Sequence, residues 1–128
     1  MIVRSLKEIS GTELDVSGPG WVSRRMLVAS DGMGYSLHDT VILSGSQLEL
    51  EYKHHYEACY CIAGSGTVMA HADGVVHKLK PYTLYALDQN DAHTVRAYED
   101  LRLVCVFNPA LTGREVHRED GSYAPPEE

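Results

Sequence analysis

Polar and apolar residues alternate in short segments that recur about every ten residues along the chain. Turn signals separate these segments, such as Ala-Gly-Ser-Gly at 63–66 and Ala-Asp-Gly at 72–74. No long stretch keeps the spacing of an amphipathic helix. The pattern predicts an all-β fold, a small barrel or jelly roll, in a single domain spanning 1–128. The predicted strands are 26–29, 36–43, 48–53, 58–63, 67–71, 75–79, 83–87, 94–97 and 101–107.

The chain is short and acidic. Its 128 residues are 44% hydrophobic, which suffices for one core without disulfides or a structural metal. A formal net charge of -7 argues against a nucleic-acid partner, because a phosphate-binding surface needs clustered Lys and Arg. No apolar run approaches the roughly 20 residues that cross a bilayer, and the first residues lack the order of a signal peptide. We therefore expect no membrane partner and a cytoplasmic location.

The C-terminal segment 113–128 differs from the rest of the chain in being polar and in ending with prolines and acids. Such a composition predicts that the segment forms no core. We expect it either to lie over the barrel as a mobile lid or to remain a solvated terminus.

Three polar residues, Ser36, His38 and Thr40, share one face of a predicted strand. Inward positions of a barrel strand are normally apolar, so this face either meets solvent or lines a pocket. Both alternatives fit the sequence.

The strand at 58–63 raises a similar question. Glu57 has the same parity as Cys59 and Cys61, which directs its carboxylate toward the side where small, easily buried residues lie. A buried anion is costly unless it is paired or binds a cation, whereas a carboxylate at the strand end can also reach water. The three cysteines, including Cys105, are interpreted as small core residues in a reducing compartment, since a structural zinc site needs four ligands.

Tyr85 and His93 are further candidates for metal binding. Tyr85 lies in the middle of a predicted strand, and His93 follows the turn Asp-Gln-Asn-Asp at 88–91. Together with Glu57 they offer a carboxylate, a phenolate and an imidazole. This ligand set suits a divalent first-row metal with open positions, with iron or zinc favoured over magnesium.

The stretch 45–64 resembles the first cupin motif, but Glu51 and Lys53 stand where cupins usually have two metal-binding histidines. His93 fits the single histidine of the second cupin motif. The chain further resembles the ectoine synthase family at Asp31-Gly-Met-Gly34, at Tyr52 with His55-x-Glu57, at 84–88, and at Val104-Cys-Val-Phe-Asn-Pro109-x-Leu-Thr-Gly-x-Glu115-Val-His117. Glu51, His54 and Tyr82 depart from the His, Asn and Gly expected there, and a Tyr after Pro81 raises the question of whether that turn needs a positive φ.

The resemblance implies an iron (Fe²⁺) cupin hydro-lyase that works as a homodimer. Its substrate is N-γ-acetyl-L-2,4-diaminobutyrate, which it cyclises with loss of water to the compatible solute ectoine. The implied iron ligands are Glu57, Tyr85 and His93. The implied substrate contacts are Trp21, Arg25, His38, Thr40, Tyr52, Phe107, Glu115 and His117.

Catalysis is assigned to Glu115, His117 and Tyr52. Glu115 and His117 are two residues apart and form the expected acid–base pair, with the two roles open between them. Arg25 is expected to clamp the substrate carboxylate.

Two other functions remain open. The same three metal ligands fit an iron-dependent dioxygenase, although oxygen-activating sites generally use two histidines and a carboxylate. A cupin that keeps the pocket and loses the metal fits a non-catalytic small-molecule sensor. Such a sensor has no need of Glu115 and His117 as proton-transfer groups.

Overall fold

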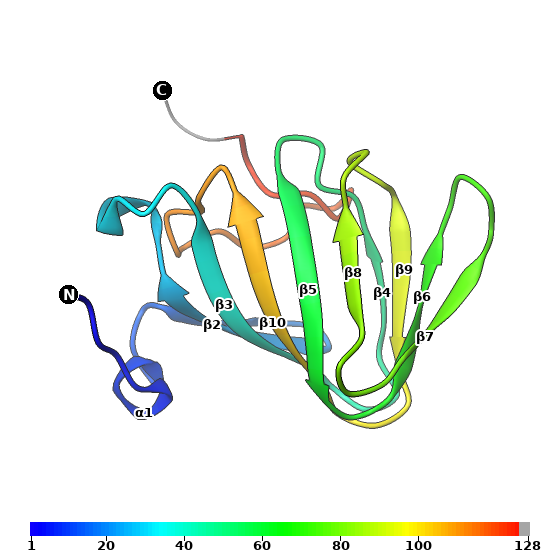
Figure 1. Ribbon diagram of the computed structural model, residues 1–128, viewed down its shortest axis with the longest axis horizontal. Coiled ribbons are helices and arrows are strands. Elements are labelled where there is room, and N and C mark those ends of the chain that lie inside the picture. Colours follow the sequence, from blue (N-terminus) through cyan, green and yellow to red (C-terminus); the bar gives the residue numbers. More distant parts are fainter. Residues whose placement is uncertain (126–128) are drawn as a thin grey trace.

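Two antiparallel β-sheets face each other in the computed structural model, which describes residues 1–125 (Figure 1). The larger sheet has the strand order β1-β2-β3-β10-β5-β8 and the smaller one the order β4-β9-β6-β7. The strands are β1 (Asp15–Gly18), β2 (Trp21–Leu27), β3 (Ser36–Ile42), β4 (Gln47–Leu50), β5 (Tyr56–Ala63), β6 (Gly66–Ala70), β7 (Val76–Leu79), β8 (Leu84–Leu87), β9 (His93–Ala97) and β10 (Leu101–Asn108). The predicted all-β class is confirmed.

Two strands near the N-terminus depart from the prediction. β1 was not predicted, and most of β2 was missed because its inward positions carry Trp21, Ser23 and Arg25, which break the apolar alternation. Within residues 1–125, the helical residues are confined to α1 (Leu6–Ile9), capped by the Ser5 hydroxyl, and the 3-10 turn η1 (Ala29–Asp31). Among residues 1–125, no helix has the length and apolarity needed to span a membrane.

Strand β10 organises the interior because it pairs with β3 on one side and with β5 on the other. Its inward side chains are Leu101, Leu103, Cys105 and Phe107, each at most 3% exposed. Full burial of a side chain such as Leu contributes about 1.5–3 kcal/mol, so the alternation along this strand is a main source of stability. Leu103, Cys105 and Phe107 of this strand form one wall of the cavity described below.

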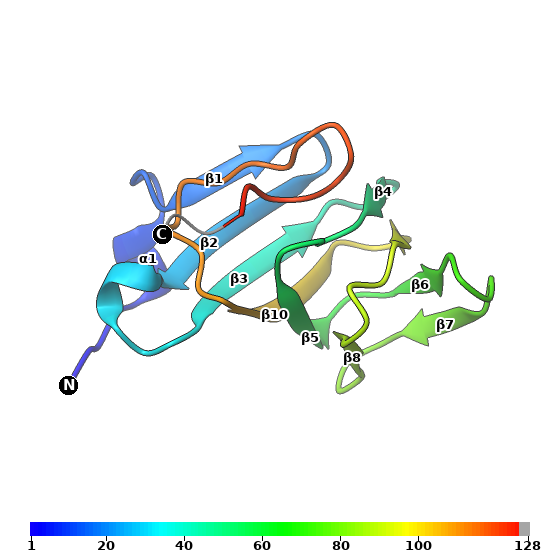
Figure 2. The same ribbon diagram turned by 90° about the horizontal axis from the view of Figure 1, so that it is seen from above.

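The C-terminal segment lies across the open end of the two sheets (Figure 2). The prediction that it forms no core is wrong, since Tyr123 is 3% exposed and belongs to the main hydrophobic cluster. The Glu51 amide donates to the Gly121 carbonyl at 3.2 Å, and Lys53 forms an ion pair with Asp120 at 3.1 Å. One aromatic residue in a polar segment therefore suffices to fix the segment over the barrel. Residues 126–128 of the predicted lid lie outside the described residues.

Candidate active site

A small cavity lies between the sheets beneath the C-terminal segment, with walls from β2, β3, β4, β5, β8 and β10. Its volume is ≈ 30 Å³, which holds about one or two water molecules. Eight of the predicted site residues line it: Trp21, His38, Thr40, Tyr52, Glu57, Tyr85, Phe107 and His117. Ser36, His38 and Thr40 thus lie on the pocket side of β3 and not toward solvent, since Ser36 and His38 are buried and Thr40 lines the cavity.

Arg25 is fully buried and binds the C-terminal segment. Its Nε donates to Ser23 Oγ at 2.9 Å, and its two terminal nitrogens donate to the main-chain carbonyls of Gly113 at 2.9 Å and Glu115 at 2.8 Å. No carboxylate of the described residues forms an ion pair with it. A guanidinium has five N–H donors, and these bonds use three of them, but Arg25 does not line the cavity in this arrangement.

The Glu115 carboxylate folds back onto its own loop. It accepts hydrogen bonds from the Thr112 amide and hydroxyl and from the amides of Gly113 and Arg114, at 2.8–3.0 Å. Burial raises the pKa of Glu115, but the hydrogen bonds from Thr112 and Gly113 outweigh burial and lower it. The group is therefore an ionised carboxylate that shapes the loop, and the structure does not place it in the cavity wall.

His117 reaches into the cavity and meets Tyr52, whose hydroxyl lies 2.8 Å from His117 Nε2. Its ring stacks on Tyr123 at 4.6 Å and meets Trp21 edge-on at 4.9 Å. Burial and the nearby Arg25 charge lower the pKa of His117 to about 4, and burial raises the pKa of Tyr52 well above its usual value. At neutral pH the imidazole is neutral and the phenol keeps its proton.

His38 lies between two serine hydroxyls in the cavity wall. Its Nδ1 is 3.3 Å from Ser23 Oγ and its Nε2 is 3.1 Å from Ser36 Oγ. Ser23 already accepts hydrogen bonds from Arg25 and Thr40, so its own proton is free for His38 Nδ1, which leaves the His38 proton on Nε2. Burial and Arg25 lower the pKa of His38 to about 3, so this imidazole is also neutral.

His93 presents a free lone pair in a buried position. Its Nδ1 is 2.8 Å from the Asp91 carbonyl, which only accepts, so the ring proton sits on Nδ1. Nε2 is buried and has no hydrogen-bond partner among the described residues. A histidine that bonds a carbonyl through one nitrogen and leaves the other bare has the form of a metal ligand. The Tyr85 ring lies 6.3 Å away, centroid to centroid.

Glu57 is a buried acid, and the described residues provide no ion pair for it. Burial raises its pKa to about 8, while hydrogen bonds from Cys59 and Cys105 act in the opposite direction. A divalent cation supplies the charge that this carboxylate lacks. Glu57, Tyr85 and His93 offer a carboxylate, a phenol and an imidazole, donors that a first-row divalent metal accepts, and of the three only Glu57 and Tyr85 line this cavity.

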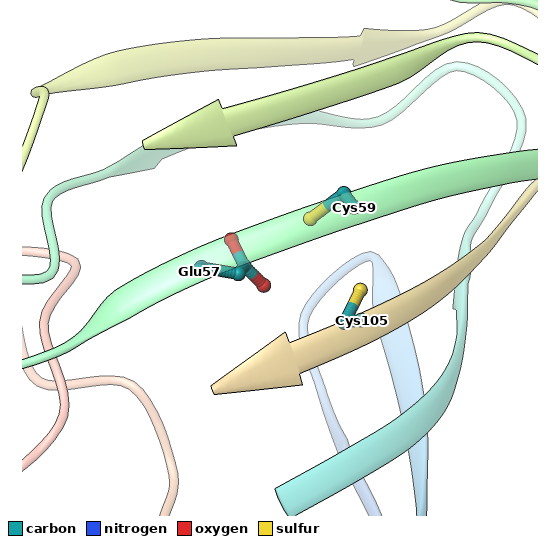
Figure 3. Close-up of side chains that lie close together, drawn as sticks. All are labelled: Glu57, Cys59 and Cys105. Carbon is teal, nitrogen blue, oxygen red and sulfur yellow. The ribbon is translucent and has the colours of Figure 1, made fainter. Parts of the chain in front are cut away.

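Two cysteines stand beside this carboxylate. One oxygen of Glu57 and the sulfurs of Cys59 and Cys105 lie within 4.8 Å of one another, and Figure 3 shows them gathered between β5 and β10. Cys59 and Cys105 are direct partners in the strand register. The interpretation of all three cysteines as small core residues is confirmed, since each belongs to the main hydrophobic cluster. Cys61 contacts the Ala63 carbonyl at 3.5 Å, whereas Cys59 and Cys105 also lie beside Glu57.

The four remaining histidines of the chain differ in burial. His54, His71 and His77 are exposed, whereas His55 is 2% exposed, has an unpartnered Nδ1 and packs edge-on against Phe107.

Among the cavity residues that sequence reasoning did not assign to the site are Ser23 and Tyr123. Ser23 could have been found from the sequence, because it shares one face of its strand with Trp21 and Arg25. The polar segment around Tyr123 offered none.

The fold and the site together define a cupin: a small double-sheet barrel with a buried, metal-competent cluster inside one end. A cupin from Shewanella frigidimarina shares the fold, with a TM-score of 0.61 at 16% identity over 75% of this chain and 82% of that one. The family model for ectoine synthase matches residues 1–127, and the chain belongs to the ectoine synthase family, whose members are hydro-lyases.

Relatives match along nearly the full length. An L-ectoine synthase from Shouchella clausii is 54% identical over 127 residues, covering 99% of this chain and 95% of that protein. One from Desulfosudis oleivorans is 53% identical over 124 residues, covering 96% of each. A crystal structure of ectoine synthase from P. lautus has a TM-score of 0.89 at 46% identity, covering 99% of this chain and 91% of that one.

Proposed function

We propose that this enzyme closes N-γ-acetyl-L-2,4-diaminobutyrate into ectoine with loss of water, using iron held by Glu57, Tyr85 and His93. The observation that carries the proposal is the neutral His117, hydrogen-bonded to Tyr52 inside a pocket with aromatic walls. A pocket that only binds a ligand has no use for such a proton acceptor. The bare, buried Nε2 of His93 supports the metal assignment.

Iron, when bound, supplies a Lewis acid that polarises the acetyl carbonyl. The remaining work falls to the protein. Ring closure joins the α-amino nitrogen to the acetyl carbon of the same molecule, so the chain must be held in a folded shape. Trp21 and Phe107 are the flat walls for this. Arg25, which does not line the closed cavity, is the proposed donor for the substrate carboxylate.

Two proton transfers complete the reaction. The α-nitrogen must give up two protons, one before it attacks and one afterwards, and the carbonyl oxygen must take up two protons to leave as water. We assign the acceptor role to His117, because a neutral imidazole can take the proton and return it through the 2.8 Å contact with Tyr52. We assign Glu115 to positioning, because its carboxylate is saturated by loop hydrogen bonds.

The substrate cannot enter the arrangement described here. A cavity of ≈ 30 Å³ is far below the roughly 300 Å³ or more of typical ligand pockets. His117 and Tyr123 close it from the C-terminal side. We therefore propose that this segment acts as a lid, opening by release of the contacts from Lys53 and Glu51.

We also propose a homodimer, formed by the outer face of the larger sheet. Tyr56 and Tyr60 of β5 and Leu84 of β8 are 53%, 40% and 60% exposed on that face. They flank a groove of ≈ 330 Å³ lined by Ala58, Ala86 and Val106. Contiguous apolar surface of this kind marks an association site, and a second copy provides a matching face under two-fold symmetry.

Sedimentation velocity tests the homodimer with a matched pair of variants. Leu84→Glu should give a monomer. Val76→Glu, a similarly exposed position on the other sheet, should stay dimeric. A wild-type monomer at micromolar concentration would exclude the homodimer.

Proton NMR of the protein with N-γ-acetyl-L-2,4-diaminobutyrate under anaerobic conditions tests the reaction. One sample contains ferrous iron and a second contains a chelator. Ectoine formed only with iron, and without dioxygen, supports the cyclisation and excludes the dioxygenase. Saturable substrate binding without product in both samples would favour the sensor.

A further inference from the structure

The mechanism proposed above leaves two buried thiols unused. Cys59 and Cys105 are 1% and 3% exposed, line the same cavity as Glu57, and face each other across β5 and β10 (Figure 3). Their sulfurs and one Glu57 oxygen lie within 4.8 Å of one another. The three groups come from rigid neighbouring strands, so their closeness is built into the sheet register.

The spacing fits a single metal ion. When three atoms lie within 4.8 Å of one another, some point lies within about 2.8 Å of all three. Zinc-type bonds are about 2.3 Å to sulfur and about 2.0–2.2 Å to oxygen, so side-chain shifts of a few tenths of an ångström complete the site. A fourth ligand can come from water, because the three residues border the cavity.

We propose that Glu57, Cys59 and Cys105 form a second metal site, selective for thiophilic d¹⁰ ions of the Zn²⁺ and Cd²⁺ type. Two thiolates and one carboxylate make a softer set than the carboxylate, phenolate and imidazole of the iron site, and thiolate ligands favour zinc over hard cations. Cys61, on the same strand, takes no part because its sulfur faces the Ala63 carbonyl.

The two sites share Glu57, so an ion at one site competes with an ion at the other for this carboxylate. An ion held by both thiols draws the Glu57 carboxylate toward β10, whereas the iron ligand Tyr85 lies on the opposite neighbour of β5, strand β8. A thiophilic ion thus inhibits the enzyme by removing one iron ligand. This inhibition rests on the proposed iron-dependent function, but the binding of the ion does not.

Cadmium titration of the metal-free protein, purified and kept anaerobic, is the direct test. We expect one Cd²⁺ per chain, a thiolate-to-cadmium charge-transfer band in the ultraviolet, and a ¹¹³Cd NMR shift typical of two sulfur ligands. Cys59→Ala and Cys105→Ala should each weaken binding by at least about tenfold and halve the band. The matched control Cys61→Ala should bind like the wild type.

Two results would overturn the proposal: a folded wild type with no charge-transfer band at stoichiometric Cd²⁺, or a band that persists in the variant lacking both Cys59 and Cys105. The NMR shift of the wild type decides the question even if a cysteine variant fails to fold.

His93→Gln separates this site from the proposed iron site. It should lose iron but bind Cd²⁺ as the wild type does. Failure of iron to bind any form of the protein, with cadmium binding intact, would contradict the proposed function alone.

Discussion

The Arg25 guanidinium donates a 2.8 Å hydrogen bond to the main-chain carbonyl of Glu115, ninety residues away in the sequence. The guanidinium donates a second hydrogen bond, at 2.9 Å, to the Gly113 carbonyl, so it binds the segment through two carbonyls. The barrel wall and the C-terminal segment are thereby joined at the residue expected to bind the substrate carboxylate. A ligand bound to Arg25 therefore contacts the same side chain that holds the segment carrying His117.

Replacing Arg25 by Lys should release the C-terminal segment, because an ammonium lacks the planar fork that reaches both carbonyls. We expect faster amide exchange at 113–123, a KM raised by about tenfold or more, and unchanged iron content. Hydrogen-exchange mass spectrometry and iron analysis measure these effects. Arg24→Lys is the control, since Arg24 pairs with Asp39 outside the pocket. Amide exchange at 113–123 as slow in Arg25→Lys as in the wild type would contradict the role of Arg25 in anchoring the segment.

Tyr52→Phe should reduce kcat by about ten- to a hundredfold with little change in KM or fold. The substitution removes only the hydroxyl that lies 2.8 Å from His117, and proton-transfer groups contribute on this scale. The pH–rate profile should lose the change in kcat that follows protonation of the Tyr52–His117 pair. Tyr98→Phe, at an exposed position, is the matched control. Equal kcat in Tyr52→Phe and wild type would remove Tyr52 from the proton path.

The metal assignment predicts that Tyr85→Phe and His93→Gln each abolish iron retention and turnover while the barrel remains folded. Both changes preserve side-chain volume approximately and remove one ligand atom. Iron per chain after gel filtration, together with a circular dichroism melt, gives the result. His77→Gln, an exposed histidine on β7, should retain iron. A fully active, iron-free Tyr85→Phe would refute the ligand set.

Acid should destabilise the fold through His38. Its pKa is about 3 in the folded protein against an ordinary value of 6.5, so only the unfolded chain takes up a proton between these values. The folding free energy that the neutral His38 contributes is fully present above about pH 6.5. It is lost as pH falls, at about 1.4 kcal/mol per pH unit. His117 acts in the same direction, and Glu57, with a raised pKa, in the opposite one.

The contribution of His38 can be isolated by comparison with His38→Asn. Urea unfolding at several values between pH 7.5 and 4.5 should give a shallower pH dependence for this variant than for the wild type. His77→Asn should leave the dependence unchanged. Parallel curves for wild type and His38→Asn would show that His38 does not stay neutral.

Tyr82→Gly should stabilise the protein by about 1 kcal/mol. Tyr82 has φ = 76° and is 80% exposed, so it holds a left-handed conformation without burying its ring. The turn therefore does need a positive φ, as the family's glycine at this position suggested. Chemical unfolding measures the gain, and Tyr82→Ala, which keeps the strain, should show none. A loss of stability in Tyr82→Gly would mean that the ring makes contacts beyond those seen.

The strands with regular apolar alternation were predicted well, because a buried strand face shows directly as a period of two. β10 is the clearest example, with four apolar or small residues facing inward. β2 was missed because Ser23 and Arg25 occupy inward positions, where they hydrogen-bond to each other and to the C-terminal segment. A sequence cannot show whether a polar residue at an inward parity is exposed or paired.

The sequence by itself determined the all-β class, the family pattern, and the strand parity that turns Glu57 inward. These depend on local periodicity and on residue types at short spacings. Only the tertiary structure decided that Tyr123 closes the pocket, that Arg25 binds the C-terminal segment, and that Cys59 and Cys105 meet at Glu57. Each of these joins residues from distant parts of the chain, and such contacts are set by sheet register and packing, which no local pattern encodes.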